Sequence, residues 1–280
     1  MRTKLLKLAL AVTLSSATLI ANAAPAYNTL TILESAPDWG IPNLATYTSL
    51  SRPDGENIVA TAWDINDSGA IAGYIAYGSS AAPFAALWAT SSSPYTQLLS
   101  LGGDGKEGNA WAINNSGSIV GYSQNADNVW KATLWSQTSL TPYSPTQLQS
   151  TFGADKSAEA LAINDSGQIV GMSINSISTD YLLPRDATAK ATLWDGASAI
   201  DLNTYLDTSN NLDGWVLNAA WRIDNDGSIY GTAFKEGIGD KYFSLQSVTA
   251  PVPEADTSAM LLMGAGLMGF IARRRKNTQA

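Results

Sequence analysis

One block of sequence occurs four times in this 280-residue chain, and it limits the choice of fold more than any other feature. Its pattern is Ala-Trp/Leu-x-Ile-Asn/Asp-x-x-Gly-x-Ile-x-Gly, and its second residue recurs at intervals of 48, 50 and 60 residues. The four copies occupy residues 62–74, 110–122, 160–172 and 220–232. Periods of about 40–50 residues are typical of β-propellers and related arrays, in which each repeat is one structural unit.

Each copy is predicted to form a β-hairpin. Its first part, Ala-Trp-x-Ile, and its last part, x-Ile-Val-Gly, are rich in strand-forming residues. Between them stands Asn-Asp-Ser-Gly or a close variant, which favours a turn because Asn and Asp bond the nearby backbone and Gly accepts a positive φ. The repeated Gly of the last part predicts a bulge or a close backbone approach.

Two further strands are expected after each hairpin. A step ending in Leu-Trp follows at residues 85–88, 131–135 and 190–194, and residues 241–245 are a degenerate fourth copy. A weaker strand comes next, as at residues 95–99 and 198–202. Four short strands per unit are the composition of a propeller blade.

The fourth unit lacks a clear last strand, and residues 28–33 are a spare strand near the N-terminus. We therefore predict an all-β repeat fold, a small β-propeller of about four four-stranded blades, with residues 28–33 completing the last blade. Such closure would avoid exposed sheet edges. The alternative is an open β-solenoid or a sandwich, in which residues 28–33 pair with the first unit.

The N-terminus is typical of a secretory signal peptide. Positive charges at Arg2, Lys4 and Lys7 precede a short apolar stretch, and Ala21-Asn22-Ala23 is a small-x-small cleavage site. We expect a signal peptidase to remove residues 1–23. The β-repeat domain would then be residues 24–250, on the outer side of the inner membrane.

The C-terminus, residues 251–280, carries an apolar segment at 259–272 followed at once by basic residues. We expect a short apolar helix there. Fourteen helical residues extend about 21 Å, against a hydrocarbon core of about 30 Å, but a snorkelling Arg cluster could extend the reach. That cluster would stay cytoplasmic, which leaves the preceding domain facing the periplasm.

This tail resembles a PEP-CTERM sorting signal. The resemblance is carried by Val252, Pro253 and Glu254, by the Gly-rich apolar run at 260–269, and by Arg273, Arg274 and Arg275 with the Lys after them. Ala255 stands where the second Pro of the family's name would be. The resemblance implies sorting by an exosortase, a membrane-embedded transpeptidase of Gram-negative bacteria that make extracellular polysaccharide. It implies an inner-membrane anchor before processing, and the cell surface or matrix afterwards.

The repeats resemble the extracellular bacterial HAF repeat. The similar stretches are Leu101-Gly102-Gly103, the block at 110–123 and the Lys-Ala-Thr-Leu-Trp step at 131–135. The His-Ala-Phe step that names the family is Lys-Ala-Thr twice and Phe-Ala-Ala once in this chain. The resemblance covers residues 60–248 and implies a β-rich, propeller-like exported protein without an established activity.

Composition excludes several kinds of chemistry. The chain has no Cys and no His, which excludes disulfides, thiol nucleophiles, imidazole metal ligands and a Ser-His-Asp triad. Its formal charge is −8, and the part between the two terminal signals has 9 basic and 22 acidic residues. Such a surface repels nucleic acid, so we expect no nucleic-acid partner.

Acidic residues in the turns suggest two alternatives. The side chains concerned are Asp64, Asn66, Asp67, Asp224 and Asp226. Oxygen ligands at such spacing resemble parts of a calcium loop, but no late bidentate Glu follows in the first copy. The other interpretation, a turn stabilised by Asn or Asp side chains, is the one that we favour. We expect no cofactor, with calcium as the alternative.

The nine Trp residues fall into two groups. Six recur at equivalent positions, and recurring positions are expected in the core because every unit packs alike. These are Trp63, Trp111 and Trp221 in the first strands, and Trp88, Trp135 and Trp194 after Leu. Trp39, Trp130 and Trp215 do not recur, so we predict that these three rings form a ligand surface for sugars.

These observations predict an exported, non-enzymatic protein of the cell surface or matrix, with exopolysaccharide or the envelope as partner. The chain shows no recognisable catalytic motif, and we predict no catalytic residues. One alternative is a glycan hydrolase that uses two carboxylates, suggested by the surplus of acids. Another is a calcium-stabilised adhesin.

Overall fold

The structure is a computed structural model that describes residues 26–33, 50, 58–77, 83–138, 141–177, 188–196, 198–204 and 214–248. Several predictions concern residues outside these ranges. They are the signal peptide with Ala21 and Ala23, the ring of Trp39, and the tail with its expected helix, Val252, Pro253, Glu254, Arg273, Arg274 and Arg275. In the described part of the chain, no helix has the length and apolar character needed to cross a membrane.

The described residues form four antiparallel four-stranded sheets, one for each copy of the repeat. The first sheet contains β2 (Ile58–Ile65), β3 (Ile71–Tyr77), β4 (Phe84–Trp88) and β5 (Tyr95–Gln97). The second contains β6 (Gly108–Ile113), β7 (Ile119–Gln124), β8 (Trp130–Thr138) and β9 (Thr141–Gln147). The third contains β10 (Ala158–Ile163), β11 (Ile169–Ile174), β12 (Ala189–Asp195) and β13 (Ser198–Asp201).

The fourth sheet joins the two ends of the domain. It contains β14 (Val216–Ile223), β15 (Ile229–Lys235), β16 (Gly239–Val248) and β1 (Ala26–Leu33). Strand β1 pairs antiparallel with β16, with Leu30 opposite Leu245 and Leu33 opposite Tyr242. The prediction that residues 28–33 complete the fourth unit is therefore confirmed, and the alternative pairing with the first unit is wrong.

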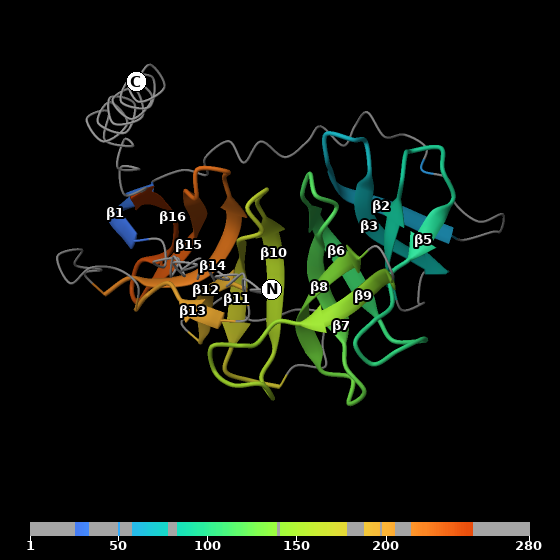
Figure 1. The fold of residues 1–280 in the computed structure, drawn as a ribbon. Coiled ribbons are helices and arrows are strands. Elements are labelled where there is room, and N and C mark those ends of the chain that lie inside the picture. The colour runs from blue at the N-terminus through green and yellow to red at the C-terminus, as the bar shows by residue number, and fades with distance from the viewer. Residues whose placement is uncertain are drawn as a thin grey trace, which may run out of the picture.

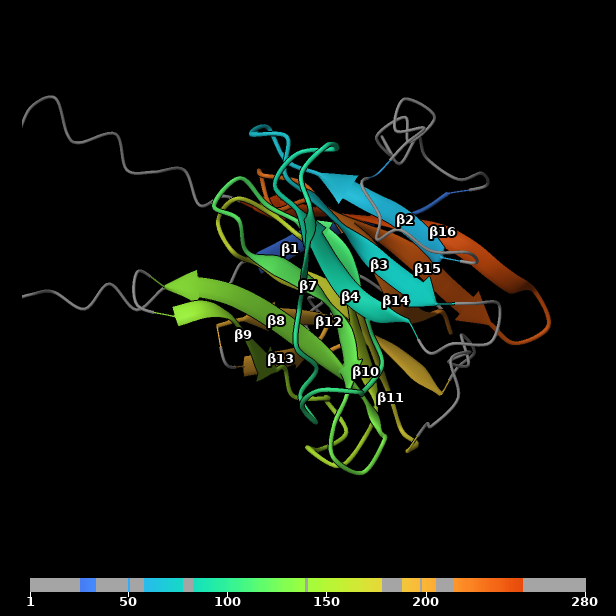
Figure 2. The same ribbon diagram turned by 90° about the vertical axis from the view of Figure 1, so that its right-hand side faces the viewer.

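The sheets follow one another in a row (Figure 1). The second strand of each sheet packs against the first strand of the next sheet. The pairs are β3 with β6, β7 with β10 and β11 with β14. The first and fourth sheets lie at opposite ends of this row in Figure 1. Figure 2 views the molecule from the end that carries the first sheet, with β2, β3 and β4 toward the viewer. The prediction of an all-β repeat fold is confirmed as four four-stranded sheets.

A β-bulge occurs at the same place in all four hairpins. In the second sheet Ala110 is opposite Gly121 and Ala112 is opposite Val120, so Trp111 is an extra residue on its strand. Equivalent register shifts place Trp63, Leu161 and Trp221 at the bulges of the other sheets. A bulge redirects side chains relative to the regular alternation of a strand. The bulge therefore decides where these large side chains point.

The repeated Gly lies beside this bulge, at a point where the two strands approach too closely for a side chain. A Cβ atom on Gly121 would lie 1.9 Å from the carbonyl oxygen of Asn109. The corresponding distances are 1.9 Å at Gly73, 2.0 Å at Gly171 and 2.1 Å at Gly231, each to a carbonyl oxygen of the partner strand. No side chain fits such a space, which confirms the close backbone approach predicted from the sequence.

The Trp residues that follow Leu form the core between sheets. Trp88, Trp135 and Trp194 are fully buried. The indole nitrogen of Trp135 donates to the carbonyl of Leu99 at 2.7 Å, and that of Trp194 donates to the carbonyl of Gln149 at 2.7 Å. Each acceptor belongs to the preceding unit. All three rings therefore fill the core, and Trp135 and Trp194 also satisfy their one donor across the joint between two units.

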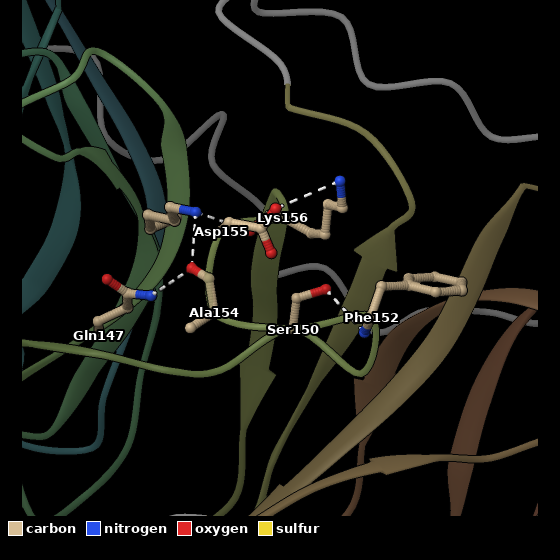
Figure 3. Close-up of polar contacts among 7 residues, drawn as sticks. Gln147, Ser150, Phe152, Ala154, Asp155 and Lys156 are labelled. Carbon is tan, nitrogen blue, oxygen red and sulfur yellow. Dashed lines mark hydrogen bonds and ion pairs between the residues drawn. The ribbon is translucent and has the colours of Figure 1, made fainter.

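The loop that connects the second sheet to the third, where Figure 3 labels Ala154 and Lys156, is held by a buried Lys of β8. The Lys131 ammonium, on β8, donates to the carbonyl oxygens of Ala154 and Lys156 at 2.9 Å each. Gln147 Nε2 donates to the same Ala154 carbonyl at 3.2 Å. Burial lowers the pKa of Lys131, whose residue is only 2% exposed. The loop is thus held in place by hydrogen bonds from a buried ammonium group.

We predict that Gly121→Ala lowers the free energy of unfolding by roughly 3 kcal/mol or more, because the new Cβ would overlap a carbonyl oxygen and force the backbone to shift. Gly167→Ala is the control. Gly167 has a φ of +82° but open space around its Cβ position, so only the left-handed backbone would be penalised, by about 1–2 kcal/mol. Urea denaturation measures both. Equal losses in the two variants would contradict the steric explanation.

We further predict that Lys131→Met lowers the free energy of unfolding by about 2 kcal/mol, the range for hydrogen bonds made by a charged group. The matched control is Lys156→Met. Lys156 makes a 3.3 Å ion pair with exposed Asp155, and exposed ion pairs contribute little. Thermal melting of the three proteins compares them, and a Lys131→Met protein as stable as the control would refute the role of this ammonium.

Candidate functional site

The turns of the four hairpins are joined by a ladder of side-chain amides. Asn66 Nδ2 donates to the carbonyl of Asn114 at 3.1 Å, and Asn114 Nδ2 donates to the carbonyl of Asn164 at 3.0 Å. Asn164 Nδ2 continues the series to the carbonyl of Asp224 at 3.1 Å. One amide at each of the first three turns thus links its sheet to the next sheet of the row.

The oxygen of the same amide stabilises its own turn. Asn66 Oδ1 accepts the backbone N–H of Ala70 at 3.0 Å, and Asn114 Oδ1 accepts that of Ser118 at 2.9 Å. Asn164 Oδ1 accepts the N–H of Gln168 at 2.9 Å. The turn stabilised by Asn side chains, which the sequence predicts, is therefore confirmed. Its second function, the link between sheets, was not predicted.

A second ladder runs beside the first and alternates acid with amide. Its members are Asp67, Asn115, Asp165 and Asn225, one from each turn. The backbone N–H of each of the first three donates at 2.9 Å to the side-chain Oδ1 of the next. The Asn115 amide also donates to the carboxylates on both sides, at 2.7 and 3.0 Å. The alternation gives each carboxylate a neighbouring amide donor.

The first ladder ends in the fourth sheet. Asp224 occupies the place of Asn66, Asn114 and Asn164, and its carboxylate has no N–H with which to continue. Arg222 Nε donates instead to Asp224 Oδ1 at 2.7 Å, as an ion pair within one strand and turn. Asp224 is thus an acceptor at the position where a link to a further sheet would need an amide donor.

Two carboxylates of these turns have pKa values shifted in opposite directions. Burial raises the pKa of Asp64 above its ordinary value of 3.8, although the carboxylate accepts the N–H groups of Ile65 at 2.8 Å and Ile113 at 2.9 Å. Hydrogen bonds from the Asn115 backbone and the Asn225 side chain lower the pKa of Asp165. Ionisation of Asp64 therefore opposes folding, whereas ionisation of Asp165 favours it.

The first strands and their turns line a cavity of about 920 Å³. Each of the four sheets contributes the five residues that begin at its bulge, and the fourth also contributes Thr232 and residues 240–242. The contributing segments are 63–67, 111–115, 161–165 and 221–225. We call this cavity the groove. It combines aromatic rings with amides and carboxylates whose positions are fixed by the two ladders.

Three Trp rings line the groove. Trp63, Trp111 and Trp221 are half-buried, and the rings of Trp63 and Trp111 lie 4.6 Å apart between centroids at 38°. The prediction that these three belong to the core is wrong. The bulge is the reason, because the extra residue does not follow the alternation of its strand into the space between sheets.

Two of the rings predicted to form a ligand surface, Trp130 and Trp215, lie in the described part of the chain, and neither lines the groove. Trp130 is 2% exposed and packs edge-on against Tyr122, with centroids 4.8 Å apart, so the prediction of an exposed ring is wrong for it. It is the first residue of β8. Trp215 is half-buried beside the core of the fourth sheet, with the Lys235 ammonium 5.9 Å from its ring centre.

The predicted calcium candidates lie in the turns and are hydrogen-bonded there. Asp64, Asn66, Asp67 and Asp224 line the groove, and Asp226 Oδ1 accepts the N–H of Ser228 at 2.8 Å. Among the described residues, no group of three or more acidic side chains has an arrangement that could hold a metal ion. Calcium binding stays a prediction.

Comparisons with known proteins identify the C-terminal tail. Residues 251–276 match the family model described as the PEP-CTERM protein-sorting motif. This motif implies an exported protein with a membrane-anchoring sorting signal that an exosortase-like enzyme recognises. No curated protein and no solved structure matches the chain significantly. The comparisons therefore characterise the tail, while the groove has to be interpreted from its own chemistry.

We predict that Asp64→Asn and Asp165→Asn change the pH dependence of stability in opposite ways. The contribution of Asp64 to the free energy of unfolding is greatest at low pH. It falls as the pH rises from 3.8 through the raised pKa of this carboxyl group. The stability of Asp64→Asn should therefore rise relative to that of the wild type across this range. Its amide oxygen can still accept one of the two N–H groups.

The control has the opposite sign. The contribution of Asp165 is present above pH 3.8 and is lost as pH falls through its lowered pKa, so Asp165→Asn should be less stable than wild type at pH 7 and approach it in acid. Urea denaturation between about pH 3 and 7 measures both differences. Parallel pH profiles for the two variants would show that the assigned shifts are wrong.

Proposed function

We propose that this protein is an exported, non-enzymatic binding protein that holds extracellular polysaccharide in the groove. The observation that carries the proposal is the meeting of three Trp rings with fixed amides and carboxylates in one cavity. A sugar ring has apolar C–H faces that stack on aromatic rings and hydroxyl groups at its rim that need donors and acceptors. The groove offers both at once.

The size of the groove is compatible with a small segment of polysaccharide. Ligand sites have volumes of about 300–1,000 Å³, and the groove has about 920 Å³. Its polar side chains are held by hydrogen bonds between turns, as in the Asn115 bridge. Such preorganised groups lose little conformational entropy when a ligand binds.

The tail supports a location where polysaccharide is present. We propose that a signal peptidase removes residues 1–23 and that an exosortase-like enzyme processes the tail, first anchored in the inner membrane, so that the domain reaches the cell surface or matrix. The resemblance of the repeats to HAF repeats agrees with this location. We further propose that the row of sheets is a variant of a small β-propeller in which β1 completes the last blade.

The alternative of a glycan hydrolase deserves a direct test because five carboxylates line the groove. Two of them would have to act as an acid and base or nucleophile pair. Release of reducing ends from the host polysaccharide, lost in Asp64→Asn or Asp224→Asn, would replace the binding proposal by an enzymatic one. The calcium-stabilised adhesin predicts a lower melting temperature in chelator.

The binding proposal is tested by affinity gel electrophoresis of the protein with polysaccharide from its native host. We expect the wild type to be retarded and a Trp111→Ala/Trp221→Ala double variant to migrate as in a gel without polysaccharide. Trp215→Ala is the control, because it removes a Trp ring that lies outside the groove lining. Melting curves identify any variant that has unfolded. An unretarded wild type would overturn the proposal.

A further inference from the structure

The fourth sheet differs from the second and third in having one open face. All six residues of β7 and all six of β11 are buried, because each of these sheets lies between two others. Strand β15 instead alternates. Ile229, Gly231 and Ala233 are buried toward the third sheet, whereas Tyr230, Thr232 and Phe234 are half-buried. Alternation of this kind marks a sheet that is covered on one side only.

The open face carries a small hydroxyl side chain at a position where the second and third sheets carry large buried side chains. Thr232 occupies the place that Tyr122 and Met172 hold in the second and third sheets. Thr232 Oγ1 accepts the indole N–H of Trp221 at 3.2 Å and donates to Asn218 Oδ1 at 2.7 Å. The amide of Asn218, fully buried, lies 3.4 Å from Asp240 Oδ1 and donates to it. A chain of hydrogen bonds thus connects the Trp221 ring to the exposed carboxylate of Asp240.

This face is part of the groove. Trp221, Thr232, Asp240, Lys241 and Tyr242 all line it. The Trp221 ring is fixed because it packs against the buried cluster that includes Met172 and Ile174 of the third sheet. The rings of Trp63 and Trp111 partly cover one another at 4.6 Å, so they offer a ligand less of their faces.

The charge of the groove limits the kind of sugar. Its lining has five carboxylates and two cations, and one of those cations, Arg222, forms a 2.7 Å ion pair with Asp224. The carboxylates of a uronic acid polymer would be repelled here, since like charges brought into a partly desolvated site are strongly unfavourable. An uncharged hexose ring brings hydroxyl groups that can donate to those same carboxylates.

We infer that the open face of the fourth sheet is the principal sugar subsite, and that it takes a neutral hexose ring stacked on Trp221 with its hydroxyl groups bonded to Asp240 and Tyr242. This inference rests on the proposed function and makes it more specific. It assigns the specificity of the protein to the end of the row, at the one sheet without a successor among the described residues.

The test compares a neutral glucan, soluble dextran or laminarin, with alginate as the acidic polymer in affinity electrophoresis of the full chain. We expect the wild type to bind a neutral glucan, and Trp221→Ala and Asp240→Asn each to weaken that binding by about tenfold or more. Asp240 is exposed, so Asp240→Asn keeps the test valid even where Trp221→Ala fails to fold. Trp215→Ala and Asp226→Asn are the matched controls and should bind within about twofold of the wild type.

The outcomes separate this inference from the proposed function. A wild type that binds no polysaccharide at all refutes the proposed function. A wild type that binds normally while Trp221→Ala and Asp240→Asn also bind normally refutes the subsite and leaves the proposed function standing. Tighter binding of alginate than of the neutral glucans overturns the assignment of a neutral sugar. Loss in both variants with intact controls supports the subsite.

Discussion

Hydrogen bonds between turn side chains determine how the four sheets are assembled. Each sheet is a separate hydrogen-bonded set of strands, so the row is joined by packing and by the amides that run from turn to turn. The Asn of each of the first three turns uses its oxygen to close the turn and its nitrogen to reach the next sheet. Because one side chain does both, the shape of the hairpin and the position of its neighbour cannot vary independently.

The bulge has a comparable effect on the groove. In each hairpin a Gly without Cβ lets the two strands approach, and the extra residue opposite it points away from the regular alternation. Three of the four extra residues are Trp. The feature that makes the repeat conspicuous in the sequence, its Trp and Gly, is therefore the same feature that supplies the aromatic lining of the groove.

The sequence was sufficient for most of the fold and for little of the site. Periodicity and turn residues predicted four four-stranded units, and the missing strand of the last unit predicted the pairing of residues 28–33. Recurrence led to the wrong environment for Trp63, Trp111 and Trp221, because a recurring residue can line a shared groove as well as a shared core. Trp130 is buried against Tyr122 of the neighbouring strand, although its position does not recur among the units. The alternation of Asp67, Asn115, Asp165 and Asn225 was a readable signal of the second ladder.

The end of the row and the character of the groove have one physical origin. A sheet with a successor needs an apolar face and an amide donor, as the second sheet has in Tyr122 and Asn114. The fourth sheet has Thr232 and Asp224 at these positions, so a hydrogen-bonded hydroxyl replaces a large buried side chain and the ladder ends in an acceptor. Substituting the donor by an acceptor disfavours a fifth sheet, and Thr232 is hydrogen-bonded to Trp221 and Asn218 within its own sheet. The same two substitutions leave Trp221 beside polar groups at the edge of the groove, which is the chemistry that a neutral sugar requires.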